Sequence, residues 1–323
     1  MMLVMKPALL LQGSLYHDAY KRLCDHFDVF DIKQLPDWNA FQRRHEHDVI
    51  ALLTNGHDGA PRSLVAQFPK LKIIACNGVG YDAVDIPYAL ERQIMVTHTP
   101  NVLNNDVANT TLLLMLAISR RLIRDAYWIE AGRWANEGNA PLTQSIEGAR
   151  VGIVGLGRIG STIACKLQAF DCEISYHARS QKSEVPYAYY ANLVEMAKAV
   201  SYLVVITPGD DSTHHLINRD VMAALGPQGT LINVARGSVV DELALVDMLK
   251  TGKLGAAALD VFENEPYVPE ALLGMDNVLL TPHVGSATDQ TRRAMGNLAA
   301  NNIISFCAEG KAISPVTECR PKI

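Results

Sequence analysis

The chain lacks an excess of basic residues. Its 323 residues include 29 Lys or Arg against 34 Asp or Glu, which gives a formal net charge of −5. Proteins that bind nucleic acid present a basic surface to the phosphates. This charge balance therefore argues against nucleic acid as a partner, whereas a small anionic substrate needs only a local positive site.

Long hydrophobic runs are also absent. The densest, "TTLLLMLAIS" (110–119), is about half as long as the roughly 20 residues that cross a bilayer. The "ALLL" near the start is too short for the core of a signal peptide, and no A-x-A-like cleavage site follows it. We therefore expect no membrane partner and a cytoplasmic protein.

Cysteine patterns that close disulfide frameworks or bind metals are missing. No two of the six cysteines are spaced as C-x-x-C, and none lies in a His/Cys metal pattern. The clusters "HEH" (45–47) and "HH" (214–215) have no further ligands at metal spacing and are interpreted as solvated surface. The sequence thus predicts reduced thiols, a reducing compartment and no metal site.

Apolar segments and helical patterns alternate along the whole chain. Hydrophobic residues make up 49% of the sequence and charged residues 20%, as in soluble globular proteins. At roughly 100–200 residues per domain, the length suggests two domains. The alternation predicts two α/β domains, each with a parallel sheet covered by helices. The expected strands are 8–12, 27–32, 49–53, 72–76, 94–97, 151–155, 173–177, 202–206, 230–234, 255–259 and 278–281.

The segment "NNDVANTTLLLMLAISRR" (104–121) predicts a helix that is apolar almost all round. Such a helix is buried on several sides. It could lie between two domains and against a partner subunit, or at the centre of one domain. A further helix is expected over 286–306 near the end of the chain.

The glycine pattern in "VGIVGLGRIG" predicts a dinucleotide site. Gly155, Gly157 and Gly160 form G-x-G-x-x-G directly after an apolar strand and before a helical pattern. Gly155 makes the tight turn, Gly157 lets the backbone approach the pyrophosphate, and Gly160 lets helix and strand pack closely. The alternative is a glycine-rich turn in another α/β fold. The residues assigned to the cofactor loop are Gly155, Leu156, Gly157, Arg158, Ile159 and Gly160.

The end of the next strand, "EISYHARS" (173–180), lacks the acidic residue that normally binds the ribose of NAD. Ala178 stands in its place, and Arg179 and Ser180 follow with a positive charge and a hydroxyl. These groups suit the 2′-phosphate of NADP, so we predict NADPH/NADP as cofactor and weaker binding of NADH. The alternative is an exposed turn that binds NAD weakly.

Three polar residues each follow a predicted strand at its carboxyl end: Arg236, Glu265 and His283. Ligands of open α/β sheets bind at that edge. An arginine fork matches a carboxylate, an imidazolium can protonate a developing alkoxide, and a neighbouring carboxylate orients the ring and favours its charged form. Together the three residues predict hydride transfer to a 2-keto acid, with a catalytic role for each.

A second glycine segment, "NGVGYDAVD" (77–85), follows a strand in the first half of the chain. Its backbone N–H groups can form an anion-binding nest. A plain glycine turn explains the same residues equally well. Further candidates for the substrate pocket are the segment "LLTNG", which contains Asn55, and Trp134 from a neighbouring loop or subunit.

Taken together, these motifs resemble the D-isomer-specific 2-hydroxyacid dehydrogenase family, and within it the glyoxylate/hydroxypyruvate reductase branch. The matching segments are "NGVGYDAVD", "TPNVLNNDVANTTLLLML", "GLGRIG", "NVARGSVVDE", "ALDVFENEP" and "LTPHVGSAT", in family order. The resemblance implies that Arg236 clamps the substrate, Glu265 pairs with the histidine and His283 is the acid/base. It also implies further contacts: Val79 and Gly80 with the substrate, and Thr111, Pro208, Val234, Asp260 and Gly285 with the cofactor.

The resemblance further implies two Rossmann-like or flavodoxin-like α/β domains with the active site in the cleft between them. Residues 1–101 and 287–323 would form a discontinuous substrate-binding domain, and 102–286 the dinucleotide-binding domain. A homodimer is expected. Asn109 and Asn104 depart from the family, which usually has Glu and Thr at these positions.

Other activities stay open at this point. The chain could reduce a larger 2-keto acid, such as a 2-keto sugar acid, or act as a corepressor-like protein that senses NAD(P). Because the chain ends soon after its last predicted helix, we expect no added regulatory domain, which disfavours phosphoglycerate as substrate. Formate enzymes of this fold have Gln at the position of Glu265, which disfavours formate.

Overall fold

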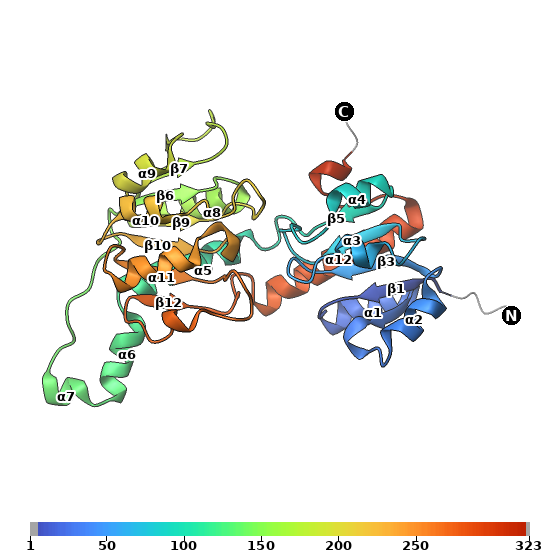
Figure 1. Cartoon of the computed structure of the whole chain (residues 1–323), viewed down its shortest axis with the longest axis horizontal. Helices are drawn as coiled ribbons and strands as arrows, with labels where there is room; N and C mark the ends of the chain where they lie inside the picture. Colours follow the sequence, from blue (N-terminus) through green and yellow to red (C-terminus); the bar gives the residue numbers. More distant parts are fainter. Residues whose placement is uncertain (1–5, 321–323) are drawn as a thin grey trace. The chain divides into compact units, whose positions relative to one another are not determined.

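The computed structural model describes residues 6–320 and contains two compact α/β units (Figure 1). The first runs from the start of the described residues to Leu103 and resumes at Thr288. The second spans Asn104–Ala287. The first unit is therefore discontinuous in sequence, with the second inserted into it.

The first unit is built on a five-stranded parallel sheet with the order β2-β1-β3-β4-β5. Its inner strands are apolar on both faces, as a parallel sheet with helices on both sides requires. The strands are β1 (Ala8–Leu11), β2 (Asp28–Asp31), β3 (Val49–Thr54), β4 (Ile73–Cys76) and β5 (Met95–Thr97).

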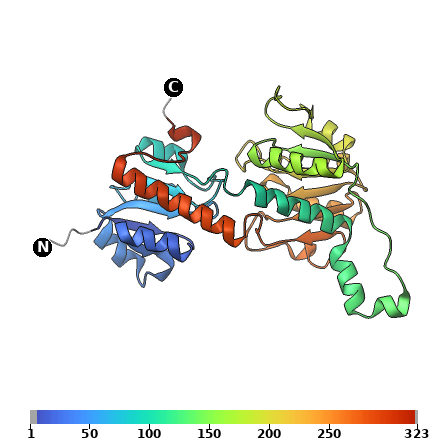
Figure 2. The ribbon, with the colours of Figure 1, turned by 180° about the vertical axis from the view of Figure 1, so that it is seen from behind.

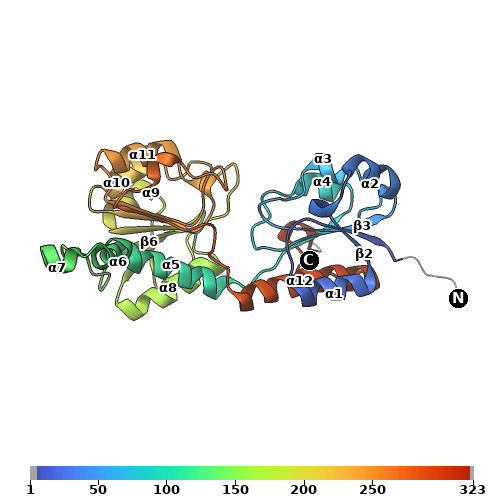
Figure 3. The same cartoon turned by 90° about the horizontal axis from the view of Figure 1, so that it is seen from below.

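Helices cover both faces of this sheet. One face carries α2 (Trp38–His45), α3 (Arg62–Val65) and α4 (Ile86–Glu91), and the other carries α1 (His17–His26) and α12 (Asp289–Glu309) (Figure 3). The last helix lies beside the first helix, as Figure 2 shows from behind. Buried alanines near the middle of α12, Ala299 and Ala300, belong to the hydrophobic core on that face.

The second unit has a seven-stranded parallel sheet with the order β12-β11-β10-β9-β6-β7-β8. The chain runs from β6 in one direction to β7 and β8, and then crosses to β9 on the other side. The order therefore reverses between β6 and β9, where ligands of doubly wound folds bind. The strands are β6 (Arg150–Val154), β7 (Glu173–His177), β8 (Ala188–Tyr189), β9 (Tyr202–Val205), β10 (Thr230–Asn233), β11 (Ala256–Leu259) and β12 (Val278–Leu280).

Two layers of helices enclose the second sheet. On one face lie α5 (Asn104–Ser119) and α8 (Arg158–Leu167), and on the other α9 (Leu193–Ala199), α10 (Arg219–Leu225) and α11 (Glu242–Lys250) (Figure 3). Two further helices extend away from this body, followed by a long loop (Figures 1 and 2). They are α6 (Leu122–Glu130) and α7 (Arg133–Glu137). Short 3₁₀ turns are Ile32–Gln34, Gln168–Phe170, Gly237–Val239, Glu270–Leu272 and Thr317–Cys319.

The sequence pattern predicted the strands well and the helix ends less well. Every predicted strand forms, with ends that differ by at most one residue. The short strand β8 was missed, because two residues carry no readable alternation. The helix predicted over 104–121 ends at Ser119, since Arg121 adopts a left-handed conformation that starts α6 instead. The predicted last helix begins and ends three residues later than expected, at Asp289 and Glu309.

The apolar helix α5 is buried along most of its length, as its composition predicts. It packs against α8 and strands β10, β11 and β12 within its own unit. On its exposed side lie Asn105, Asn109 and the apolar Leu113, which has 56% of its surface exposed. In the part of the chain that the structure describes, no helix combines the length and apolar character needed to span a bilayer.

Candidate active site

The three residues predicted to carry the chemistry follow three neighbouring strands. Arg236 comes after β10, Glu265 after β11 and His283 after β12, and these strands lie side by side in the order β12-β11-β10. Because the strands are parallel, their carboxyl ends meet at one edge of the sheet. The fold of the second unit therefore brings all three loops to the same edge.

His283 and Glu265 are in direct contact. The ring Nδ1 of His283 lies 2.7 Å from Oε2 of Glu265. Glu265 is mostly buried, with 18% of its side chain exposed, whereas His283 is 44% exposed. The other carboxylate oxygen of Glu265 accepts the backbone N–H of Phe262 at 3.1 Å. The carboxylate is thus fixed on one side and orients the imidazole on the other, which leaves Nε2 as the ring atom that can exchange a proton with a ligand.

The backbone at His283 is held in an unusual conformation by a buried aspartate. His283 has a φ of +51°, in the left-handed region that non-glycine residues rarely adopt. Asp260 is 2% exposed. Its Oδ1 accepts hydrogen bonds from the Thr281 hydroxyl at 2.6 Å and the Val284 N–H at 2.8 Å, and its Oδ2 accepts the Gly285 N–H at 2.8 Å. The carboxylate of Asp260 therefore organises the loop that presents His283.

Arg236 stands at the start of a tight turn that needs glycine beside it. Its backbone carbonyl accepts a hydrogen bond from the Asn233 side chain at 2.9 Å, and its Nη1 donates to the Ala235 carbonyl at 2.8 Å. A side chain at Gly237 would place its Cβ 1.9 Å from the carbonyl carbon of Phe262. Close packing between the loops after β10 and β11 thus fixes the backbone at Arg236.

A second set of polar residues supports these loops, and sequence reasoning missed it. Glu242, at the start of α11, is buried, and its Oε1 accepts the backbone N–H of Glu263 at 2.8 Å. Burial raises the pKa of the Glu242 carboxyl above its usual range. The Oε1 of Glu263 in turn lies 2.8 Å from Nε2 of His215. The interpretation of "HH" as solvated surface is therefore wrong for His215, because contacts between loops are invisible in the sequence pattern.

The glycine loop after β6 has the geometry that the sequence predicts. Gly155 has a φ of +102°, and a Cβ there would lie 2.7 Å from the carbonyl oxygen of Ile206. A Cβ on Gly160 would lie 2.1 Å from the carbonyl oxygen of Gly155, whereas Gly157 faces open space. Gly157 precedes the first turn of α8. The loop leaves room at the helix N-terminus for a pyrophosphate, at the point where the strand order reverses.

The turn after β7 lies next to this glycine loop. The Gly155 N–H donates to the carbonyl of His177 at 2.9 Å. Arg179 and Ser180 are both exposed, so their side chains are accessible to a phosphate group of a bound cofactor. Lys182, which sequence reasoning did not single out, donates from Nζ to the carbonyl of Leu156. The structure thus adds a second cation to this turn beside Arg179.

The other cofactor candidates follow further strands of the same sheet or lie on α5. Pro208 is exposed after β9, and Val234 is buried directly after β10. The Gly285 carbonyl accepts a hydrogen bond from the Thr110 hydroxyl at 3.2 Å. Thr111 is fully buried, and its hydroxyl donates to the Val107 carbonyl at 2.8 Å. The contact predicted between Thr111 and a cofactor stays a prediction.

In the first unit, Asn55 follows β3 and forms its own turn. Its Oδ1 accepts the backbone N–H groups of His57 and Asp58 at 2.9 and 2.8 Å, and its Nδ2 donates to the Asp58 carboxylate at 2.8 Å. Thr54 is buried and donates to the Gly59 carbonyl at 2.6 Å. The side chains of this loop are therefore engaged locally, as in an Asx turn.

The glycine segment after β4 presents backbone groups instead. The Val79 carbonyl accepts a hydrogen bond from Nδ1 of the buried His98 at 3.0 Å, which fixes the peptide. Among the residues that the structure describes, none accepts a hydrogen bond from the N–H of Val79 or Gly80. Two adjacent donors of this kind suit a carboxylate.

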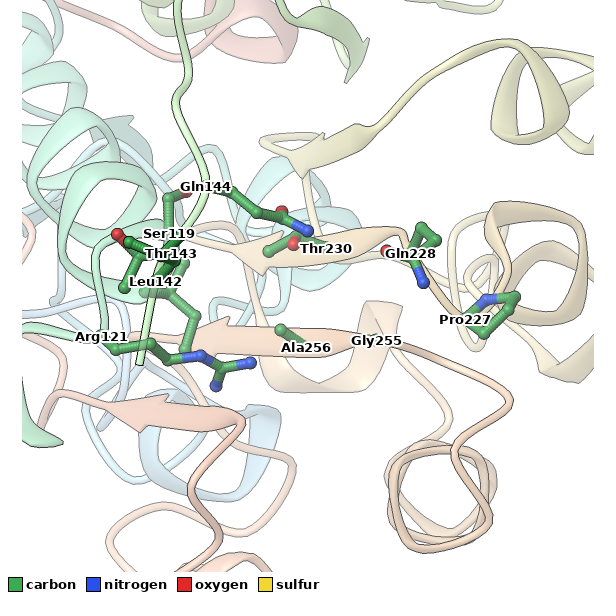
Figure 4. Close-up of a pocket in the computed structure, with 11 residues that line it drawn as sticks. Ser119, Arg121, Leu142, Thr143, Gln144, Pro227, Gln228, Thr230, Gly255 and Ala256 are labelled. Atoms are coloured by element: carbon green, nitrogen blue, oxygen red, sulfur yellow. The ribbon is translucent and has the colours of Figure 1, made fainter. Parts of the chain in front are cut away.

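A cavity of about 210 Å³ lies elsewhere in the second unit (Figure 4). Thr230 and Ala256, which line it, begin strands β10 and β11. Ser119, the last residue of α5, and Arg121, just before α6, also line it. This cavity is therefore at the amino ends of the strands, at the opposite edge of the sheet from Arg236, Glu265 and His283.

Comparison with known proteins identifies the family. The sequence profile described as D-isomer specific 2-hydroxyacid dehydrogenase, NAD binding domain, matches residues 112–285. A glyoxylate/hydroxypyruvate reductase A of Arabidopsis thaliana is 42% identical over 290 residues, which cover 90% of this chain and 92% of the relative. The chain belongs to the D-isomer specific 2-hydroxyacid dehydrogenase family. The resemblance inferred from the motifs is thereby confirmed.

Other members of this family are equally similar. A hydroxyphenylpyruvate reductase of Plectranthus scutellarioides is 42% identical over 92% of this chain and 94% of the relative. The structure of an NADPH-dependent glyoxylate/hydroxypyruvate reductase from Sinorhizobium meliloti, in complex with NADP and malonate, matches with a TM-score of 0.91 and 43% identity. That match covers 98% of this chain and 100% of the solved one. The chain is thus an NAD(P)-dependent oxidoreductase of this family with two Rossmann-like α/β units.

Proposed function

We propose that this protein reduces glyoxylate and hydroxypyruvate to the corresponding 2-hydroxy acids with NADPH, and gives the D isomer where a stereocentre forms. The observation that carries the proposal is the 2.7 Å contact between His283 and Glu265, at the same sheet edge as Arg236. The Arabidopsis and Sinorhizobium relatives are named for the same reaction. The glycine loop after β6 fits the pyrophosphate of a dinucleotide, because Gly157 faces open space at the start of α8 while close packing at Gly155 and Gly160 fixes the loop.

His283 is the proposed acid. When bound, NADPH supplies the hydride that reduces the keto carbon. The Nδ1–H of His283 donates a hydrogen bond to Glu265, so Nε2 carries the proton that is delivered to the carbonyl oxygen. Glu265 stabilises the imidazolium before this transfer and keeps the ring in one orientation afterwards. In the reverse direction the same nitrogen accepts the proton of the hydroxy acid.

Arg236 is the proposed clamp for the substrate. A guanidinium can bind a carboxylate through two parallel hydrogen bonds and polarise the adjacent carbonyl oxygen. We further propose that the N–H groups of Val79 and Gly80 bind the same carboxylate. The first unit would then be the substrate-binding domain and the second the dinucleotide-binding domain.

The preference for NADPH over NADH is proposed from the turn after β7. Arg179 and Ser180 are exposed there, with Ala178 in place of an acidic residue. Lys182 is tethered to the glycine loop and adds positive charge near this turn. The 2′-phosphate of NADPH would lie near two cations, and none of these residues is a carboxylate that would repel it. The ribose hydroxyls of NADH would lack the carboxylate that normally accepts their hydrogen bonds.

We also propose that the protein is a homodimer in the cytoplasm. Large apolar side chains are exposed together on α6, α7 and the loop that follows: Leu122, Ile123, Tyr127, Ile129, Trp134 and Leu142. A patch of this kind marks a protein interface, and a symmetric dimer is the commonest assembly. Trp134 would then reach the pocket of the partner subunit. All six cysteines are free, which fits a reducing compartment.

The proposal is tested by assaying the purified protein against a panel of 2-keto acids with NADPH and with NADH. We expect rapid turnover of glyoxylate or hydroxypyruvate with NADPH. Faster turnover of an aromatic or sugar-derived keto acid would favour the alternative of a larger substrate, for which the hydroxyphenylpyruvate reductase relative is the argument. An absence of turnover across the panel would favour a corepressor-like sensor of the cofactor.

A further inference from the structure

Two adjacent histidines and a glutamate meet outside the proposed catalytic trio. His214 and His215 lie in the segment between β9 and α10, and Glu263 lies in the loop after β11. One ligand atom from each, two imidazole nitrogens and a carboxylate oxygen, lie within 4.8 Å of one another. The sequence does not show this cluster, because Glu263 is distant from the histidines along the chain.

The backbone holds the three side chains in place. His215 has a φ of +49°, a left-handed conformation that is kept by its N–H donating to the Ser238 carbonyl at 2.8 Å. The rings of His214 and His215 are stacked with their centres 3.9 Å apart. Glu263 is fixed through its own N–H, which donates to Glu242. Strained backbone of this kind is found at ligand sites, where neighbouring contacts maintain it.

The charges around the cluster favour a cation. Glu263, the buried Glu242 and Glu265 are carboxylates of neighbouring segments, and His215 is the direct partner of Glu263. A divalent cation beside Glu263 would offset the mutual repulsion of these carboxylates.

We propose that His214, His215 and Glu263 form a binding site for a zinc-like divalent cation, with a remaining position open to water. Two imidazoles and one carboxylate are a donor set that zinc accepts in tetrahedral sites, whereas calcium and magnesium prefer oxygen ligands. The ion would replace the proton that Nε2 of His215 and Oε1 of Glu263 share at 2.8 Å. It would tie the segment after β9 to the loop that carries Glu265.

Zinc binding to the full-length protein tests the proposal without any assay of activity. The protein is first stripped of metal with a chelator and then titrated with zinc chloride by calorimetry. We expect one strong site per chain. Because the ion binds the folded state, thermal unfolding should shift upwards by several degrees at roughly a hundredfold excess of zinc over the dissociation constant.

Two variants locate the site. His214→Ala removes an exposed side chain and should weaken zinc binding by about tenfold or more, and Glu263→Gln should do the same, because each removes one of the three ligands. His47→Ala is the matched control: His47 is also an exposed histidine beside a glutamate, but it lies in the first unit. This variant should bind zinc as the wild type does.

The outcomes separate this site from other zinc ligands of the chain. If zinc bound instead to an exposed thiol such as Cys165, or to the pair His283–Glu265, the His214→Ala variant would bind it with the same affinity as the wild type. Wild-type affinity in both His214→Ala and Glu263→Gln would therefore overturn the proposal, and so would an absence of zinc binding to the wild type. A loss in either variant, with normal binding by His47→Ala, supports it.

Discussion

The two sheets of this protein present different kinds of groups at the carboxyl ends of their strands. In the second unit, charged side chains are held by other side chains: Glu265 fixes His283, and Asp260 fixes the loop around it. In the first unit, the side chain of Asn55 makes its hydrogen bonds within its own turn, and the glycine segment after β4 offers backbone N–H groups. The same type of sheet edge is thus organised for two different tasks.

This difference has a physical reason. Groups that exchange a proton or carry a charge in the reaction need fixed orientation and fixed partners, which only a network of side chains provides. A carboxylate that is bound but not altered needs only donors, and backbone N–H groups supply them at no cost in side-chain entropy. Substitutions in the second unit should therefore alter turnover, and side-chain substitutions in the first unit should alter mainly stability.

The largest effect is expected for His283→Ala. Removing the acid should lower kcat by roughly 10²–10⁴-fold, with a small change in KM for the keto acid. Glu265→Gln should cause a smaller loss, because the amide can still orient the ring but no longer stabilises its charged form. Steady-state kinetics at neutral pH measure both, and near-normal kcat in His283→Ala would refute the acid assignment.

Arg236→Ala should raise KM for the keto acid and also lower kcat. The fork is proposed to bind the carboxylate in the ground state and the polarised carbonyl in the transition state, so both parameters depend on it. Arg236→Lys keeps the charge without the planar fork and should recover only part of the loss. If KM in Arg236→Ala stayed at the wild-type value, the substrate clamp would have to be another group.

Arg179→Ala should reduce the preference for NADPH by roughly tenfold to a hundredfold, because a charge-assisted hydrogen bond contributes about 1.5–3 kcal/mol. The loss should be confined to NADPH, and exposure of Arg179 points to the lower figure. Ala178→Asp should shift the preference towards NADH. The measurement is kcat/KM for both cofactors; equal losses for both in Arg179→Ala would mean that the turn binds no phosphate.

The smallest effect on catalysis is expected for Asn55→Ala, although Asn55 was a candidate for substrate binding. Its side chain closes the turn at residues 55–58, so its loss should lower the free energy of unfolding by about 1 kcal/mol. KM should change little. Thermal unfolding and steady-state kinetics on the same preparation separate the two roles: a large rise in KM with unchanged stability would restore Asn55 to the pocket.

Much of the fold could be predicted because each signal is local. A buried parallel strand reads as a short apolar run, and the glycine loop shows its positive-φ turn and close contact through the residue type alone. Helix ends were harder, as Arg121 shows: a left-handed residue ended α5 early although the helical pattern continued. The candidate trio was recognised because Arg236, Glu265 and His283 each follow a strand, and parallel strands end at one edge.

The sequence by itself determined the two α/β units, the glycine loop, the strand ends that carry the trio and the family to which the chain belongs. Only the tertiary structure decided which polar groups meet. Asp260 as the anchor of the His283 loop, Glu242 as the support of Glu263, and His215 as the partner of Glu263 all depend on contacts between separate loops. Local patterns do not encode such contacts, because they arise from the register and order of strands in the sheet.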